Sequence, residues 1–213
     1  MDIKGIIFDL DGVIVFTDHF HYLAWKKMAD DIDTYFDETI NNRLRGVSRM
    51  DSLEIILERY AGPALSEDDK LKLAEKKNVL YVEYLKQMTP NDVTNEVRET
   101  LKELRNRGYK LSIGSSSKNA KFILNRVELT DYFDAISDGT NITRSKPDPE
   151  VFVKASEFLG LKPEECAVVE DAYAGIDAAK DGGMIGVGIG DAVNYERTDY
   201  KLSTFSDLLK IFK

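Results

Sequence analysis

The sequence predicts an α/β protein with a doubly wound, mainly parallel sheet and a helical segment inserted after its first strand. Two observations lead to this fold class. Short apolar runs alternate with helical patterns from about residue 91 onward, and one further apolar run, residues 3–8, stands apart at the beginning of the chain. The 213 residues suffice for one such core and a small second domain. We therefore expect an α/β domain of residues 1–16 and 90–213, and a helical domain of residues 17–89.

Four strands are expected where short apolar runs stand beside turn residues. The first is the run Ile-Lys-Gly-Ile-Ile-Phe, which ends directly before an acidic turn. The other three are Leu111–Gly114, Ala167–Val169 and Met184–Ile189. Short runs of this composition are typical of strands buried in a parallel sheet.

Apolar residues at helical spacing fill the intervals, and glycines stand where several of these helices should end. The helices expected between the strands are Val93–Leu104, Phe122–Val127, Val151–Leu159 and Ala172–Ala179, with ends at Gly108, Gly160 and Gly182–Gly183. Those expected in the inserted segment are His19–Asp30, Glu38–Arg45, Arg49–Tyr60 and Glu67–Met88. A last amphipathic helix is expected at Thr204–Lys213.

The composition narrows the possible partners. The net charge of −9 is unfavourable for binding a nucleic-acid backbone or an anionic membrane surface, so a small-molecule partner is expected. Cys166 is the only cysteine, which excludes an intramolecular disulfide. No signal peptide is visible and no apolar segment is long enough to span a bilayer. A cytoplasmic monomer is the resulting expectation.

The strongest chemical signal follows the first strand. Asp9 and Asp11 are two residues apart, so both carboxylates can point the same way from an extended chain. Parallel sheets place their ligands at the carboxyl ends of strands, where Gly12 permits a tight turn. One carboxylate can attack phosphorus while the other moves a proton. The alternative is an acidic loop that is solvated or binds a structural cation.

Three further motifs follow predicted strands or precede predicted helices. Ser115–Asn119 offers hydroxyl and N–H groups to a phosphate, and Lys146 can offset charge on a transferring phosphoryl group. Glu170 and Asp171, together with Asp9, offer hard oxygen ligands for Mg²⁺. Taken singly, these motifs have ordinary alternatives: a helix N-cap, a surface lysine, and acids near a helix N-terminus. Their order along the chain favours a phosphoryl-transfer site.

The four motifs, in this order, resemble those of the haloacid dehalogenase superfamily, which has a Rossmann-type core, and the resemblance covers essentially the whole chain. It implies that Asp9 is the nucleophile and that Asp11 is the general acid and base. The implied Mg²⁺ ligands are Asp9, the backbone carbonyl of Asp11, Glu170 and Asp171. The residues implied to bind the transferring phosphoryl group are Ser115 and Lys146.

The inserted segment resembles the cap domain of the β-phosphoglucomutases within that superfamily. The motifs concerned are His21 with Trp25, Arg45–Arg49, Asp51-Ser52 and Lys77-Asn78. The resemblance implies an enzyme that interconverts β-D-glucose 1-phosphate and glucose 6-phosphate through an aspartyl phosphate and glucose 1,6-bisphosphate. The residues implied to bind the distal phosphate are Arg49, Ser117, Lys118 and Asn119. Those implied to contact the sugar or couple the cap to the core are Thr17, His21, Trp25, Arg45, Gly46, Val47, Ser52, Lys77 and Asn78.

Some questions stay open at this point. Phe16 and Arg45 depart from the family pattern, which often has Asp and Lys at these positions. The core motifs do not separate a mutase from a sugar-phosphate phosphatase, which is the alternative function, and a non-catalytic metal-binding module is a third reading. Arg45 and Arg49 could be solvated helix charges, and His21 and Trp25 could form one side of an amphipathic helix.

Overall fold

The chain divides into two compact units in a computed structural model that describes residues 2–44 and 47–213. One unit consists of Met1–Phe16 and Met88–Lys213, and the other of Thr17–Gln87. The boundary at residue 88 lies two positions before the one expected from the sequence. The predicted roles of Arg45 and Gly46 lie outside the described residues.

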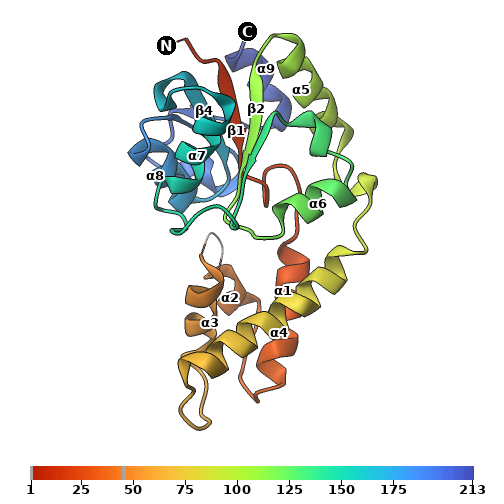
Figure 1. Ribbon diagram of the computed structural model, residues 1–213, viewed down its shortest axis with the longest axis vertical. Coiled ribbons are helices and arrows are strands. Elements are labelled where there is room, and N and C mark those ends of the chain that lie inside the picture. Colours follow the sequence, from red (N-terminus) through yellow and green to blue (C-terminus); the bar gives the residue numbers. More distant parts are fainter. Residues whose placement is uncertain (1, 45–46) are drawn as a thin grey trace. The chain divides into compact units, whose positions relative to one another are not determined.

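Within the described residues, the first unit is built on a six-stranded sheet whose neighbouring strands are all parallel (Figure 1). The strands are β1 (Gly5–Phe8), β2 (Lys110–Gly114), β3 (Ala135–Ser137), β4 (Cys166–Glu170), β5 (Ile185–Gly188) and β6 (Tyr200–Lys201). Their order is β3-β2-β1-β4-β5-β6, so the chain winds outward from β1 in both directions. The predicted doubly wound, parallel fold class is confirmed.

Helices cover both faces of this sheet. They are α5 (Asn95–Asn106), α6 (Ala120–Arg126), α7 (Glu150–Leu159), α8 (Tyr173–Asp181) and α9 (Leu208–Ile211). Helices α7 and α8 lie on one face of the sheet, and α5 and α6 lie on the other (Figure 1). Phe152 and Ala155 of α7 pack in one buried cluster with Ile7 and Val168 of the central strands. This packing holds the carboxyl ends of β1 and β4 at one rigid edge.

The ends of the sheet differ from the sequence prediction. Strands β3 and β6 were not predicted, because runs of three and two residues show no periodicity. The helix predicted at residues 204–213 was wrong in extent: a 3₁₀ turn at Phe205–Asp207 precedes the four-residue α9. The Asp207 carboxylate accepts the N–H groups of Ser203 and Thr204, which forms this turn ahead of the helix.

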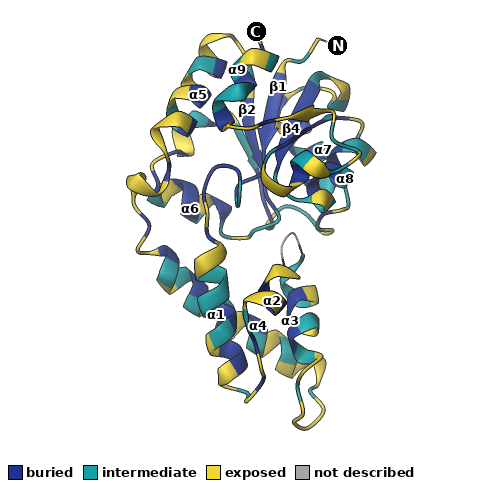
Figure 2. Ribbon diagram, turned by 180° about the vertical axis from the view of Figure 1, so that it is seen from behind, coloured by how far each residue is buried: buried dark blue, intermediate teal, exposed yellow. Residues whose placement is uncertain are grey.

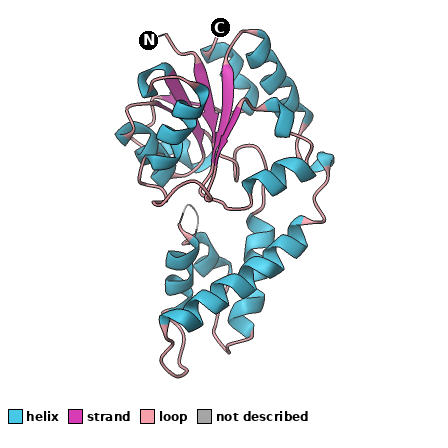
Figure 3. Cartoon of the chain, in the orientation of Figure 1, coloured by secondary structure: helices cyan, strands magenta, loops and turns pink. Residues whose placement is uncertain are grey.

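The second unit consists of helices joined by loops, with no strand among its described residues (Figure 3). Its helices are α1 (Asp18–Asp30), α2 (Glu38–Asn42), α3 (Arg49–Leu57) and α4 (Glu67–Leu85). The side chains of Asp37, Ser48 and Ser66 accept N–H groups in the first turns of α2, α3 and α4. Each helix buries one face and exposes the other (Figure 2), and the shared core includes Trp25 and Met28. Helices α3 and α4 both end three residues earlier than predicted.

None of the helices in the described parts of the chain is long and apolar enough to cross a lipid bilayer.

Candidate active site

Three acidic residues gather at the carboxyl ends of two adjacent strands. Asp9 follows β1, Glu170 ends β4, and Asp171 comes directly after it. The two strands are paired in register, with Phe8 opposite Val169. One carboxylate oxygen from each acid lies within 4.8 Å of the other two. Hard oxygens at this spacing are suited to a divalent cation such as Mg²⁺.

Burial makes this acidic cluster electrostatically unfavourable unless a cation accompanies it. Asp9 is 7% exposed and Glu170 is 1% exposed. Burial raises the pKa of Asp9 well above its usual range, although the positive charge of Lys146 opposes the shift. Burial and the charge of Glu170 raise the pKa of Asp171 to about 7. A divalent cation would relieve both effects, so the three acids fit a Mg²⁺ ion.

Lys146 brings a cation into the cluster from the protein itself. Its ammonium donates to Oδ1 of Asp9, and to Oε1 of Glu170 at 2.6 Å. Burial works against this ammonium, but the charges of Asp9 and Glu170 raise the pKa of Lys146 above its usual value. Lys146 is therefore a buried cation, 8% exposed, and the alternative of a surface lysine was wrong.

Glu170 is held in place by its neighbours. Its Oε2 accepts the N–H of Ala172 at 2.9 Å, while Oε1 accepts from Lys146. Gly175 in α8 leaves the space that the carboxyl group occupies, since a Cβ there would lie 1.9 Å from Cδ of Glu170. The sequence analysis missed Gly175. A glycine inside a helix destabilises the helix by about 1 kcal/mol relative to alanine. A glycine within a predicted helix therefore indicates a position where space is needed, and this pattern could have identified Gly175.

The turn after β1 lies against Asp171. Gly12 has a φ of +96°, and its N–H donates to the carbonyl of Val15 at 2.7 Å. A Cβ on Gly12 would lie 2.2 Å from Oδ2 of Asp171. The position therefore requires glycine for its backbone conformation and for the space beside the acid. Asp11, one residue earlier, pairs with Val15 in an isolated β-bridge.

Gly12→Ala is expected to weaken Mg²⁺ binding by about 10- to 100-fold, because the added methyl group displaces Asp171. Calorimetric titration with Mg²⁺ measures the loss. Gly108→Ala is the matched control: Gly108 has a φ of +90°, but no described residue other than its chain neighbours lies within 4 Å of its Cβ position. Both variants should lose similar stability through backbone strain, whereas only Gly12→Ala should lose affinity. Equal Mg²⁺ affinities in the two variants would contradict this account.

Residues Ser115–Asn119 form a loop between β2 and α6. The hydroxyl of Ser115 accepts the N–H of Ser117 at 3.1 Å, and that of Ser117 accepts the N–H of Asn119 at 3.2 Å. Gly139, after β3, donates its N–H to the carbonyl of Ser117 at 3.1 Å and supports the loop. Because β2 pairs with β1, the loop lies at the same edge of the sheet as Asp9. Asn119, not a serine, occupies the N-cap of α6.

Helices α1 and α4 bring together several of the cap residues predicted from the sequence. Nζ of Lys77 lies 2.8 Å from Nδ1 of His21 and 4.7 Å from the centre of the Trp25 ring. Lys77 is buried, and Trp25 belongs to the apolar core of the unit. Trp25 therefore also fits the amphipathic-helix alternative, while the His21–Lys77 pair is a polar contact inside the unit.

Arg49 is held by α4. It donates to Oδ1 of Asn78 at 2.8 Å and lies 3.7 Å from the carboxylate of Glu75. Burial lowers the pKa of Arg49 from its usual value, which does not fit a fully solvated helix charge. Val47 is partly buried ahead of α3, and Ser52 is buried within it.

His21 is expected to stay neutral in the folded protein at mildly acidic pH. Burial lowers the pKa of His21 well below its usual value, and the charges of Lys77 and Arg49 lower it further. An unfolded histidine has a pKa of about 6.5. Below that pH the unfolded chain binds a proton that the folded unit does not, so stability falls as the pH falls toward the folded pKa.

Nuclear magnetic resonance of a His19→Gln variant measures this directly, because His21 is then the only histidine. Its ring signals should still be those of neutral imidazole at the pH where a solvated histidine is half protonated, about 6.5. A peptide of residues 18–24 carrying the same substitution supplies the solvated reference. If His21 in the folded protein became protonated at the same pH as the histidine of the peptide, the expectation would be contradicted.

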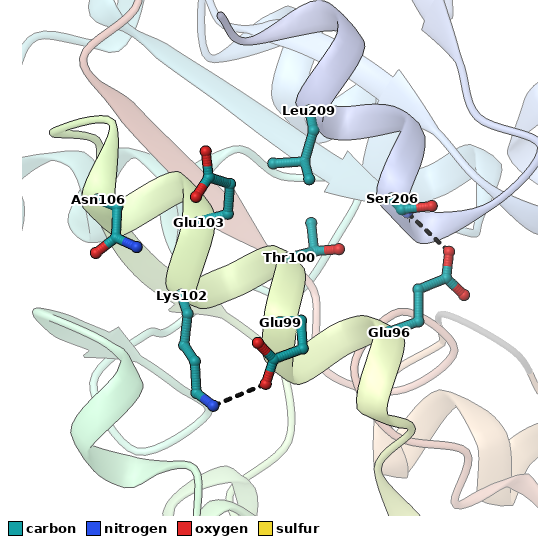
Figure 4. A pocket seen from close by; sticks show the side chains of 8 residues that line it. All are labelled: Glu96, Glu99, Thr100, Lys102, Glu103, Asn106, Ser206 and Leu209. Carbon is teal, nitrogen blue, oxygen red and sulfur yellow. Dashed lines mark hydrogen bonds and ion pairs between the residues drawn. The ribbon is translucent and has the colours of Figure 1, made fainter.

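A separate hollow of about 400 Å³ lies on the first unit, beside α5 and the turn before α9 (Figure 4). Glu96 accepts the N–H of Ser206 at 2.9 Å, and Glu99 accepts from Lys102 at 2.8 Å. The residues that line it are Glu96, Glu99, Thr100, Lys102, Glu103, Asn106, Ser206 and Leu209. Glu103 accepts from Nε of Arg107 at 2.8 Å, so all three carboxylates serve local structure. The hollow contains none of the predicted site residues.

Comparison with known proteins establishes the family. The sequence model of the family described as haloacid dehalogenase-like hydrolase matches residues 3–183. The chain belongs to this family. The family assignment confirms the resemblance drawn from the four motifs, and it places Asp9, Lys146 and the Glu170-Asp171 pair within the matched segment.

The chain is similar in sequence and in structure to several members of this family. It is 41% identical to the β-phosphoglucomutase of Bacillus subtilis over 206 residues, which cover 96% of this chain and 91% of that protein. It is 30% identical to the phosphorylated carbohydrates phosphatase of Thermotoga maritima, over 85% of this chain and 82% of that protein. The crystal structure of the β-phosphoglucomutase of Clostridium difficile matches with a TM-score of 0.89 at 36% identity, over 97% of this chain and 93% of that one.

Proposed function

We propose that this protein is a β-phosphoglucomutase, which interconverts β-D-glucose 1-phosphate and glucose 6-phosphate. The observation that carries the proposal is the similarity to β-phosphoglucomutases along nearly the whole chain, the inserted helical unit included. The buried group of Asp9, Lys146 and Glu170 supports phosphoryl transfer as the chemistry.

In this mechanism Asp9 carries the phosphoryl group between two sugar oxygens. The O6 oxygen of β-glucose 1-phosphate attacks the phosphorus on Asp9, and the bond from phosphorus to the Asp9 carboxylate breaks. The product, glucose 1,6-bisphosphate, then presents its other phosphate. Asp9 attacks that phosphorus, the bond to O1 breaks, and glucose 6-phosphate leaves while Asp9 is phosphorylated again.

Asp11 and Lys146 have complementary roles in both transfers. Asp11 takes the proton from the O6 hydroxyl as that oxygen attacks, and it returns a proton to O1 as that oxygen leaves. Lys146 favours the ionised carboxylate of Asp9 against the effect of burial, and it offsets charge on the phosphoryl oxygens, which Ser115 also binds. Asp9, the backbone carbonyl of Asp11, Glu170 and Asp171 would hold a Mg²⁺ ion, which would further offset that charge.

The substrate's second phosphate and its sugar ring need contacts of their own. Arg49 suits a phosphate because its guanidinium can donate two parallel hydrogen bonds. Ser117, Lys118 and Asn119 offer donors from the first unit. The residues proposed to contact the sugar or couple the cap to the core are Thr17, His21, Trp25, Arg45, Gly46, Val47, Ser52, Lys77 and Asn78.

The helical unit, predicted as residues 17–89, serves in this proposal to exclude water from the reaction. An acyl phosphate open to water would be hydrolysed, so a mutase must exclude water while the sugar is bound. We place the enzyme in the cytoplasm as a monomer. The single cysteine, Cys166, is buried and unbridged, which fits a reducing compartment.

A coupled assay tests the proposal. The protein is given β-glucose 1-phosphate, Mg²⁺ and a trace of glucose 1,6-bisphosphate, while glucose 6-phosphate and free phosphate are followed together. A mutase forms glucose 6-phosphate with little free phosphate. Free phosphate that matches substrate loss would establish the second candidate, a sugar-phosphate phosphatase, which the similarity to the Thermotoga maritima phosphatase favours.

A further inference from the structure

We infer that Tyr81 is a positioning residue for the sugar-binding part of the site: it holds His21 in the neutral tautomer whose Nε2 carries the proton. The inference rests on the proposed function, in which His21 and Lys77 contact the sugar. Tyr81 was not among the residues predicted from the sequence, and it acts through its neighbours.

Tyr81 contacts three of the predicted substrate residues at once. Its ring stacks on His21 with the ring centres 4.0 Å apart and the planes 29° apart. The ammonium of Lys77 lies 4.6 Å from the centre of the same ring. The Tyr81 hydroxyl donates to Oγ1 of Thr17 at 3.1 Å. One side chain of α4 thus connects Lys77 with the first turn of α1, where the backbone N–H of His21 donates to the backbone carbonyl of Thr17.

The contact between Lys77 and His21 determines the tautomer. A lysine ammonium has three donors and no acceptor, so Nδ1 of His21 must accept its hydrogen bond. An imidazole that accepts at Nδ1 carries its proton on Nε2. The charged form of Lys77 is stabilised by the faces of Tyr81 and Trp25, and it repels a protonated His21. The ring of Tyr81 therefore stabilises both members of the pair.

Burial distinguishes the residue that can reach a ligand from the one that positions it. Tyr81 is 1% exposed and Lys77 is 3% exposed, whereas His21 keeps part of its surface accessible. Nε2–H of His21 is then the donor available for a sugar oxygen. Tyr81 contributes by restraining the ring that carries this donor.

The ring and the hydroxyl of Tyr81 can be tested separately. Tyr81→Phe keeps the stacking and removes the hydroxyl that bonds to Thr17, whereas Tyr81→Leu loses the aromatic face. Tyr84→Leu is the matched control, because Tyr84 also lies on α4 and stacks on Phe20 of α1 instead. All three variants are made in the His19→Gln background, which leaves a single histidine signal.

Nitrogen-15 nuclear magnetic resonance at neutral pH reads the tautomer, and steady-state kinetics read KM and kcat for β-glucose 1-phosphate. We expect the Nε2–H pattern in the His19→Gln protein, in Tyr81→Phe and in Tyr84→Leu. In Tyr81→Leu we expect mixed tautomers or a protonated ring, with KM raised about 10-fold and kcat changed less, as loss of substrate positioning predicts. Tyr81→Phe should restore KM to within about 3-fold.

An Nδ1–H tautomer or a protonated His21 in the His19→Gln protein would overturn the inference. This test needs no Tyr81 variant, so it remains decisive even if Tyr81→Leu does not fold. An unchanged tautomer and KM in folded Tyr81→Leu would overturn it as well. The resonance measurement needs no turnover. Failure of the mutase assay with the Nε2–H tautomer intact would therefore count against the proposed function alone.

Discussion

Asp9→Asn is expected to lower the conversion of β-glucose 1-phosphate to glucose 6-phosphate by about 10⁴-fold or more, because an amide cannot form the acyl phosphate. The substitution preserves shape and leaves Lys146 an oxygen partner at the position of Oδ1. The fold should therefore persist, as judged by circular dichroism and thermal unfolding. The coupled assay measures the rate. Incubation with glucose 1,6-bisphosphate labelled with phosphorus-32 measures protein-bound phosphate, which should be absent from the variant.

Asp134→Asn is the matched control for this experiment. Asp134 also lies beside the sheet, but its carboxylate accepts the N–H of Leu111 near the start of β2, away from the carboxyl ends of the strands. Its loss should leave turnover within about 3-fold of the unmodified protein, as is usual for changes outside the reacting centre. If Asp9→Asn kept a tenth of the activity or retained the label, Asp9 would not be the nucleophile, and the mutase and phosphatase mechanisms would both fail.

Lys146→Met is expected to reduce both activity and stability. Turnover should fall by about 10³-fold, because a buried positive charge beside the phosphoryl group is lost. In the metal-free protein the free energy of unfolding should fall by about 3–5 kcal/mol, since Asp9 and Glu170 are left buried without their cation. Added Mg²⁺ should recover part of the stability by offsetting the same charges. Urea unfolding with and without a chelator measures these effects.

Lys154→Met provides the control for removing a lysine near the same segment. Lys154 pairs with Glu150 at 3.0 Å on the partly exposed side of α7. Pairs of this kind contribute about 0–1 kcal/mol, so the control should lose little stability and respond weakly to Mg²⁺. Equal stability losses in the two variants would show that Lys146 does not balance the charge of the acidic cluster.

Much of the fold could be predicted from the sequence because its signals are local. The apolar run that forms β1 is fully buried, and Gly160 ends α7 in the left-handed conformation that glycine adopts most readily. The alternation of strands and helices was enough to predict a parallel sheet. In such a sheet every strand ends at the same edge, so residues that follow separate strands, such as Asp9 and Ser115, were expected together.

The short edge strands β3 and β6 could not be predicted in this way. Strand β3 pairs with β2 through Ser112–Gly114, and the two residues of β6 pair with β5. Segments this short adopt an extended conformation because a neighbouring strand offers hydrogen bonds, and not because of their own sequence.

The sequence by itself determined the fold class and the residues at the carboxyl edge of the sheet, since the positions and ends of the four main strands follow from local patterns. Only the tertiary structure decided that Lys146 is buried against Asp9, 137 positions away, and that Tyr81 stacks on His21. Side-chain contacts between distant segments depend on how helices and strands pack. Burial then decides which charges need partners and which side chains are held in place.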